Sequence, residues 1–252
     1  MGDVWIPDRP LTMTEVLRAL EMLEDDWRIY FEVQDVTGLN KTGLTMTMIV
    51  AGFFGALRGE EVCKIDVGTM REHWKESTED PRHPHVPLMM AGKFKRETGI
   101  KLFCQPLALK SNSGVDICGI FRRTLGVQER LGVTHGPLFR TKGKRDTHFK
   151  PASVGDLDIM FRDVLKRIQQ KWPNVIPESV KVEEEYSMSR SPRRGSTAEA
   201  QNQEIPREVI EANNRWRKRM RSKGLTPGMS MMERYTDAKA SVKALTRYSR
   251  NL

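Results

Sequence analysis

The chain has 252 residues, of which 38% are hydrophobic, enough to build the core of one large domain or two small ones. Residues 1–185 hold 27 basic and 27 acidic side chains, so the formal net charge of +9 comes entirely from the last 67 residues, which hold 15 and 6. Three cysteines without metal-ligand spacing exclude a disulfide scaffold, and the longest apolar run, residues 48–57, is too short to span a bilayer.

These limits predict a soluble intracellular protein that does not bind membranes, located in the nucleus, cytoplasm or nucleoid depending on the host. A first amphipathic helix is expected after Pro10, because Thr12 and Glu15 can form a capping box and apolar residues follow at helical spacing. Residues 42–57 are apolar on most sides and predict a central buried helix. Strand character over residues 61–68, 85–90 and 99–109 predicts a small sheet.

The second half of the chain predicts helices over residues 117–125 and 153–172, the latter with Ser153 as cap and Pro173 as its end. Three further helices are expected over residues 195–205, 206–214 and 229–249, and residues 215–228 are too basic and too rich in Gly and Pro to be core. The predicted fold class is α+β and mostly α, with a small antiparallel sheet inserted near residues 60–110.

The charge excess of the C-terminal third suits a polyanion such as a nucleic acid, and the alternative is a solvated basic face that keeps the protein soluble. Arg193 and Arg194 stand where a loop gives way to a helix that is expected to begin near Gly195. A guanidinium fork can bind two phosphate oxygens, and a helix N-terminus adds N–H donors for an anion. Arg58 ends the buried helix, and Glu61 lies three residues on, where its carboxylate can hold the guanidinium.

The stretches "GALRGEEV", "RSPRRG", "PREVIEANNRW" and "MERYTDA" follow one another in the order of the motifs of a known family. With them the chain resembles the catalytic domain of the tyrosine recombinases, the phage integrase family. That domain has an arginine followed three residues later by a glutamate, a lysine on a β-hairpin, a His-x-x-Arg element, a histidine or tryptophan, and a tyrosine nucleophile.

The resemblance implies roles for four residues of the first and second arginine motifs. Arg58 matches the first arginine and Glu61 its glutamate, while Arg193 matches the second arginine. Arg190 occupies the usual histidine position, a departure that removes a neutral general base and keeps a phosphate ligand.

The later motifs imply that Trp216 takes the histidine-or-tryptophan position and that Tyr235 is the nucleophile, with Tyr248 as its rival. The spacing between Trp216 and Tyr235 exceeds the family's by the length of the basic loop. For the hairpin lysine we favour Lys95, and Lys93 remains open because it shares the same strand face.

The implied reaction is site-specific DNA recombination or integration, as in mobile elements, without metal or other cofactor. Tyr235 would cleave one strand of double-stranded DNA and form a 3′-phosphotyrosine, which the 5′-hydroxyl of a partner strand then attacks. The arginines would neutralise charge, Trp216 would donate a hydrogen bond, and Lys95 would protonate the leaving oxygen. Family members assemble on DNA, so a tetramer is expected. Further DNA contacts are expected from neighbouring basic side chains: Arg194, Arg215, Arg217, Lys218 and Arg219.

Residues 1–10 are interpreted as a lead-in and residues 11–252 as the catalytic domain, which leaves no room for the family's N-terminal core-binding domain and indicates a fragment or an atypical member. Two alternatives stay open. One is a DNA-binding protein derived from a recombinase that lost catalysis through Arg190 and Glu97, and the other is an enzyme like type IB topoisomerases. His83 and His85 have no third ligand nearby in sequence and are interpreted as a polar loop.

Overall fold

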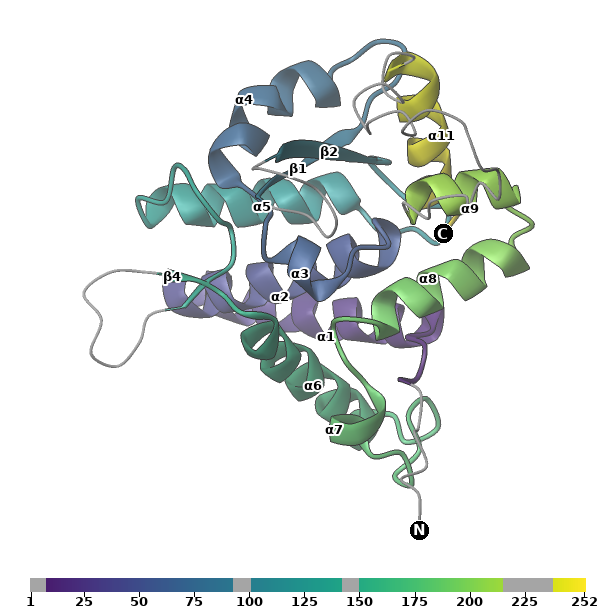
Figure 1. Ribbon diagram of the computed structural model, residues 1–252. Coiled ribbons are helices and arrows are strands. Elements are labelled where there is room, and N and C mark those ends of the chain that lie inside the picture. Colours follow the sequence, from purple (N-terminus) through teal and green to yellow (C-terminus); the bar gives the residue numbers. More distant parts are fainter. Residues whose placement is uncertain (1–7, 93–100, 142–149, 215–237) are drawn as a thin grey trace.

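The computed structural model describes residues 8–92, 101–141, 150–214 and 238–252. The described chain is mostly helical with a small antiparallel sheet, which confirms the expected α+β, mostly α class (Figure 1). Its helices are α1 (Met13–Glu32), α2 (Val36–Phe54), α3 (Gly59–Val62), α4 (Val67–Thr78), α5 (Ile117–Arg130), α6 (Val154–Lys171), α7 (Val182–Glu185), α8 (Ser191–Asn202), α9 (Arg207–Asn213) and α11 (Ala238–Asn251). Its strands are β1 (Val86–Gly92), β2 (Lys101–Leu107), β3 (Arg140–Thr141) and β4 (Lys150–Pro151).

Helix α2 is the centre of the core, as its apolar sequence predicts. Every residue from Thr42 to Phe54 is buried, and the helix packs against α1, α3, α5, α6 and α8. Figure 1 shows α6 and α7 on one side of α1 and α2, and α4, α5 and the β1–β2 pair on the other. A helix that is apolar all round is stable only in such surroundings, because it has no face to turn to water.

Helices α1 and α6 begin where their caps predict. Thr12 Oγ1 accepts from the backbone N–H of Glu15 at 3.2 Å, and the Glu15 carboxylate accepts from the N–H of Thr12 at 2.6 Å. Ser153 and Asp156 form the same reciprocal pair at the start of α6. The last residue of α6 is Lys171, two residues before Pro173. Each cap satisfies N–H groups that have no partner inside the helix.

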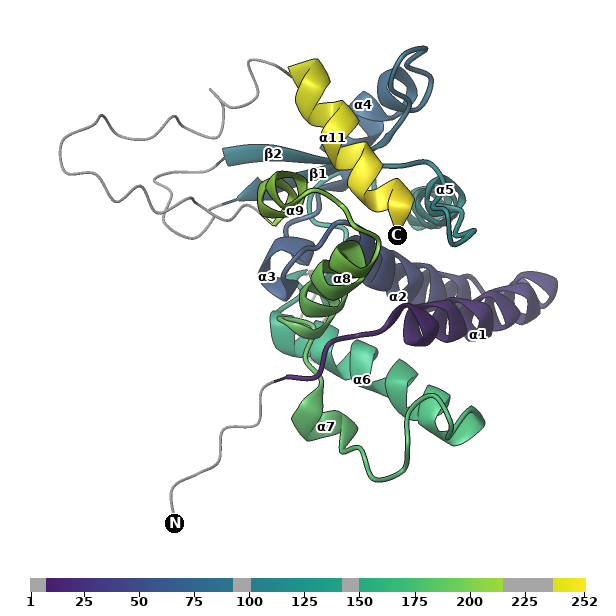
Figure 2. The same cartoon turned by 90° about the vertical axis from the view of Figure 1, so that its right-hand side faces the viewer.

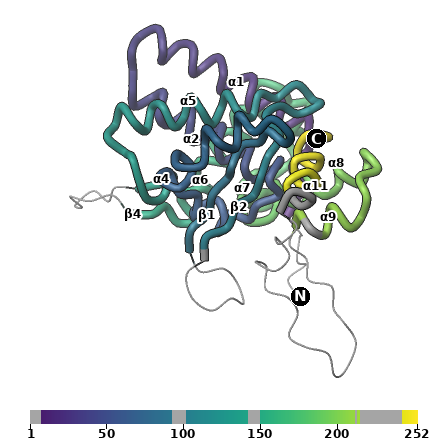
Figure 3. The backbone as a smooth tube through the Cα atoms, turned by 90° about the horizontal axis from the view of Figure 1, so that it is seen from above, coloured from purple at the N-terminus to yellow at the C-terminus, as the bar shows by residue number. Residues whose placement is uncertain are grey.

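Strands β1 and β2 form an antiparallel pair in which Val86 lies opposite Leu107 and Gly92 opposite Lys101. Helix α4 packs on β1 and helix α11 on β2. Seen from above, α8, α9 and α11 gather on one side of the strand pair (Figure 3). Strand β2 therefore connects the sheet to the C-terminal helices.

Two predicted elements are corrected by the structure. The stretch 61–68, expected as a strand, is the end of α3 and the start of α4, and only Ile65 and Asp66 form isolated bridges. Asp66 Oδ1 accepts from the N–H of Thr69 at 2.9 Å and caps α4, a signal that the short apolar run concealed. Helix α8 begins at Ser191 instead of near Gly195, because Pro192 stands in its first turn.

The chain before α1 lies against α8, with α8 itself between α1 and α9 (Figure 2). The N–H of Leu11 donates to the Ser191 carbonyl at 2.9 Å, and the carbonyl oxygen of Leu11 lies where a β-carbon on Gly195 would come within 1.6 Å of it. Only glycine admits this approach of backbone to backbone. None of the helices in the described ranges is both long and apolar enough to cross a membrane.

Candidate functional site

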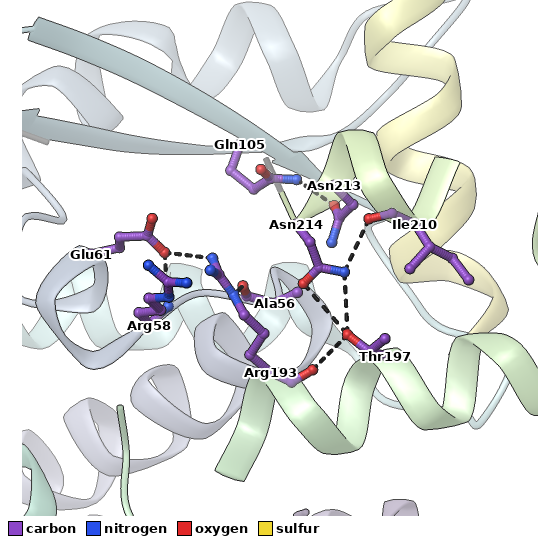
Figure 4. A network of polar contacts seen from close by, with 9 residues as sticks. All are labelled: Ala56, Arg58, Glu61, Gln105, Arg193, Thr197, Ile210, Asn213 and Asn214. Atoms are coloured by element: carbon purple, nitrogen blue, oxygen red, sulfur yellow. Dashed lines mark hydrogen bonds and ion pairs between the residues drawn. The ribbon is translucent and has the colours of Figure 1, made fainter. Parts of the chain in front are cut away.

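The structure brings Arg58 and Arg193 to one carboxylate, that of Glu61 (Figure 4). Glu61 Oε2 accepts from Arg193 Nη2 at 2.7 Å and from the backbone N–H of Arg58 at 2.8 Å. The side chain of Arg193 is 8% exposed and that of Glu61 14% exposed, whereas Arg58 is exposed. The site thus combines a fixed guanidinium with one that faces solvent.

The expected ion pair between Arg58 and Glu61 is wrong in its detail. Arg58 does not end α2; it is the N-cap of the short helix α3, and Glu61 binds its backbone N–H. Among the described residues, Glu61 forms an ion pair with Arg193. The two arginines are therefore linked through one acidic side chain.

A left-handed turn after α2 helps to hold Arg193. Ala56 has φ +47°, a region that non-glycine residues seldom adopt, and its carbonyl oxygen accepts from Arg193 Nε at 2.5 Å. Strained backbone of this kind is typical of functional positions, because the surrounding structure must stabilise it. Arg193 is held on one edge by this carbonyl and on another by Glu61.

Arg190 and Arg194 are both exposed on the first turn of α8. Arg190 Nη1 lies 3.1 Å from a carboxylate oxygen of Asp8, an acidic residue of the segment before α1. The Arg190 side chain is 59% exposed and that of Asp8 15% exposed, so the pair is open to water on one side. Asp8 partly neutralises the residue that stands in the family's histidine position.

Tyr248 on α11 is fully buried next to the same turn of α8. Its hydroxyl lies 2.7 Å from the hydroxyl of Ser196. Burial raises the pKa of Tyr248 to about 12, and the hydrogen bond with Ser196 opposes part of that rise. A phenol that is sealed from solvent cannot reach a DNA backbone, so in the described structure Tyr248 is an anchor of α11.

A buried amide network, missed by sequence reasoning, lies beside Arg193 (Figure 4). Gln105 Nε2 donates to Asn213 Oδ1 at 2.7 Å, and Asn214 Nδ2 donates to Thr197 Oγ1 at 3.2 Å. Thr197 in turn donates to the carbonyl of Arg193 at 2.8 Å. Two signals were available: a glutamine on the buried face of an apolar strand, and two adjacent asparagines at the end of a helix.

The other predicted site residues lie outside the described ranges. These are Lys93, Lys95, Arg215, Trp216, Arg217, Lys218, Arg219 and Tyr235, and their roles stay predictions. No protein-family model matches the chain, and no curated protein or solved structure matches it significantly.

Proposed function

We propose that the chain cleaves and rejoins DNA strands in the manner of a tyrosine recombinase catalytic domain, with Tyr235 as nucleophile and a 3′-phosphotyrosine intermediate. One observation carries the proposal. Arg193 and Glu61, 132 residues apart in sequence, form a largely buried ion pair, and the same carboxylate binds the backbone of Arg58. The two arginines that the motif order selects therefore lie at one place in the fold.

The charges at this place suit a phosphodiester. Counted over Arg58, Arg193 and Glu61, two guanidinium groups and one carboxylate leave one net positive charge. This charge can bind a singly charged phosphate, and the attraction strengthens as negative charge develops on the phosphate oxygens in the transition state. A fixed Arg193 needs no reorganisation when the substrate binds, and an exposed Arg58 can reach a DNA backbone. Double-stranded DNA is the partner on this proposal, and the chain assembles on it as a tetramer.

A covalent-capture assay tests the proposal. The protein is incubated with a broad pool of nicked duplexes and denatured, and protein–DNA adducts are isolated and sequenced. We expect an adduct that Tyr235→Phe abolishes and that Tyr248→Phe retains, provided that circular dichroism shows the second variant to be folded. An adduct that survives Tyr235→Phe contradicts the assignment of the nucleophile.

Two other outcomes would move the function to one of the alternatives. A parent protein that binds the duplexes and captures none of them supports a non-catalytic DNA-binding protein. Relaxation of supercoiled plasmid without strand exchange supports an activity like that of type IB topoisomerases.

The same assay tests Lys95 as general acid. A duplex in which the leaving 5′-oxygen is replaced by sulfur has a leaving group that needs no proton. We expect Lys95→Ala to lose cleavage on ordinary DNA and to recover it on this substrate. Lys93→Ala is the matched control and should cleave both, whereas recovery by Lys93→Ala alone would assign the role to Lys93.

A further inference from the structure

Gln105 on β2 and Asn213 at the end of α9 bury two amides, 1% and 0% exposed, against each other. Gln105 shares the buried face of its strand with Phe103 and Leu107. The Nδ2 donor of Asn213 makes no well-formed hydrogen bond among the described residues, although the Asn213 side chain lies close enough to the Tyr248 hydroxyl to oppose part of the rise that burial causes in the pKa of that phenol. Burying an apolar pair of the same shape would cost less free energy of desolvation. The two amides therefore have a role other than stabilising the fold.

The hydrogen bond between the two amides restricts how the end of α9 can be oriented relative to β2. It joins residues 108 positions apart and connects the end of α9 to β2. Buried polar pairs are directional, whereas apolar contacts allow one element to slide along another. The end of α9 is thereby fixed relative to the β1–β2 pair.

The next residue extends this link to the arginine site. Asn214, 1% exposed, donates to Thr197 Oγ1 at 3.2 Å and to the Ile210 carbonyl at 3.0 Å. Thr197 donates to the Arg193 carbonyl at 2.8 Å, one helical turn away. Figure 4 shows the Gln105–Asn213 contact between β2 and α9 and the contacts of Asn214 with Thr197 on α8, and the two sets are joined through the backbone from Asn213 to Asn214. At the other end of this network, Arg193 holds Ala56 and Glu61.

We propose that Gln105, Asn213, Asn214 and Thr197 are positioning residues that fix Arg193 and the end of α9 relative to the β1–β2 pair. This inference rests on the proposed function, because it assigns the network to the alignment of that site. Two guanidinium groups can bind one phosphate only if their separation is held, and a displacement of about 1 Å can cost on the order of 100-fold in rate. The network acts through Arg193 and does not touch the substrate.

An amide swap separates this role from simple packing. Gln105→Asn and Asn213→Gln each break the contact, by shortening or lengthening one side chain, and the double variant restores two amides with the same total length. Gln128→Asn with Asn40→Gln is a matched control, since Gln128 donates to Asn40 in the same chemistry between α5 and α2. None of these changes alters the charge that dominates DNA affinity.

The first readout is the Arg193 Nε–H signal in a nitrogen–proton correlation spectrum, which needs no DNA. We expect each single variant at 105 or 213 to shift or broaden this signal, the double variant to restore it, and the control pair to leave it unchanged. A signal that does not respond to the single variants, or that the double variant fails to restore, overturns the inference whether or not the protein cleaves DNA.

The second readout is the rate of covalent capture. The single variants should slow capture by on the order of 10- to 100-fold while the Kd for DNA stays within about threefold. If a single variant does not fold, Thr197→Val breaks the same link without a change of volume, and Thr197→Ser keeps the hydroxyl. The valine variant should reproduce both effects and the serine variant neither; equal behaviour of the two would also overturn the inference. If the variants change the Arg193 signal as expected but the parent protein captures no DNA, the proposed function is refuted and the inference about the network stands.

Discussion

Glu61→Gln removes the charge that pairs with Arg193 and keeps the shape of the side chain. Breaking a buried ion pair by loss of one partner costs about 3–5 kcal/mol, because the remaining charge stays buried without compensation. The Glu61 side chain is 14% exposed, and the amide oxygen of glutamine can still accept from Arg193 Nη2 and from the Arg58 N–H, so we expect a smaller cost of about 2 kcal/mol.

Urea unfolding at neutral pH measures this loss as a shift of the midpoint at constant slope. Glu21→Gln is the matched control. Glu21 pairs with Arg18 on the surface, where the side chains are 50% and 43% exposed, and its loss should cost less than about 0.5 kcal/mol. A cost for Glu61→Gln no larger than that of Glu21→Gln would refute the account of a largely buried pair.

A double-mutant cycle isolates the ion pair from other effects of the substitution. Arg193→Met keeps much of the side-chain volume and removes the cation. If Glu61 and Arg193 stabilise each other, the double variant should lose less free energy of unfolding than the sum of the single variants, by about 1–3 kcal/mol. Strict additivity would show that the contact contributes nothing to stability.

The remaining predictions concern the N-terminal segment and the buried phenol. Gly195→Ala should lower the free energy of unfolding by several kcal/mol, because the new β-carbon would lie 1.6 Å from the backbone oxygen of Leu11. Gly126→Ala, in open space on α5, should raise it by about 0.5–1 kcal/mol. Thermal unfolding measures both, and similar effects of the two variants would contradict the close approach of Leu11 to Gly195. Asp8→Asn should change the free energy of unfolding by less than about 1 kcal/mol. On the proposed function it should also tighten DNA binding and steepen the salt dependence of that binding, because Arg190 loses its acidic partner. Unchanged DNA binding would contradict a role for Arg190 as a phosphate ligand. Burial raises the pKa of Tyr248 to about 12, so the protonated phenol contributes fully to the free energy of unfolding below pH 10, and about 3 kcal/mol is lost as the pH rises through 12. Urea unfolding at a series of pH values measures this loss, and Tyr248→Phe should reduce the pH dependence above pH 10. The same pH dependence in the variant and the parent would contradict the buried phenol as its source.

Local signals in the sequence were sufficient for much of the fold. The capping pairs at Thr12 and Ser153 and the apolar periodicity behind them predicted α1 and α6. The two strands of the sheet were predicted from short apolar runs flanked by turn residues, and the buried character of α2 followed from its composition. These features depend on residues close together in sequence, and for that reason they can be predicted from it.

The failures have a common physical origin in tertiary contacts. The run around Ile65 has the same short apolar pattern in a strand and in a helix–turn–helix, and the Asp66 cap decided between them. Glu61 is three residues from Arg58, yet its ionic partner comes from α8, which no local spacing predicts. The contacts of Gln105 and Asp8 with α9 and α8 likewise arise only when distant segments fold together.

The central place of α2 has a consequence for the synthesis of the protein. The helix is complete at Phe54, but α8, which covers part of it, ends only at Asn202. Ribosomes add about 5–20 residues per second, so this apolar helix waits roughly 7 to 30 s until α8 is complete. During that interval the nascent chain exposes a surface that chaperones recognise, and we expect overproduction to yield more native protein at low temperature or with added chaperones.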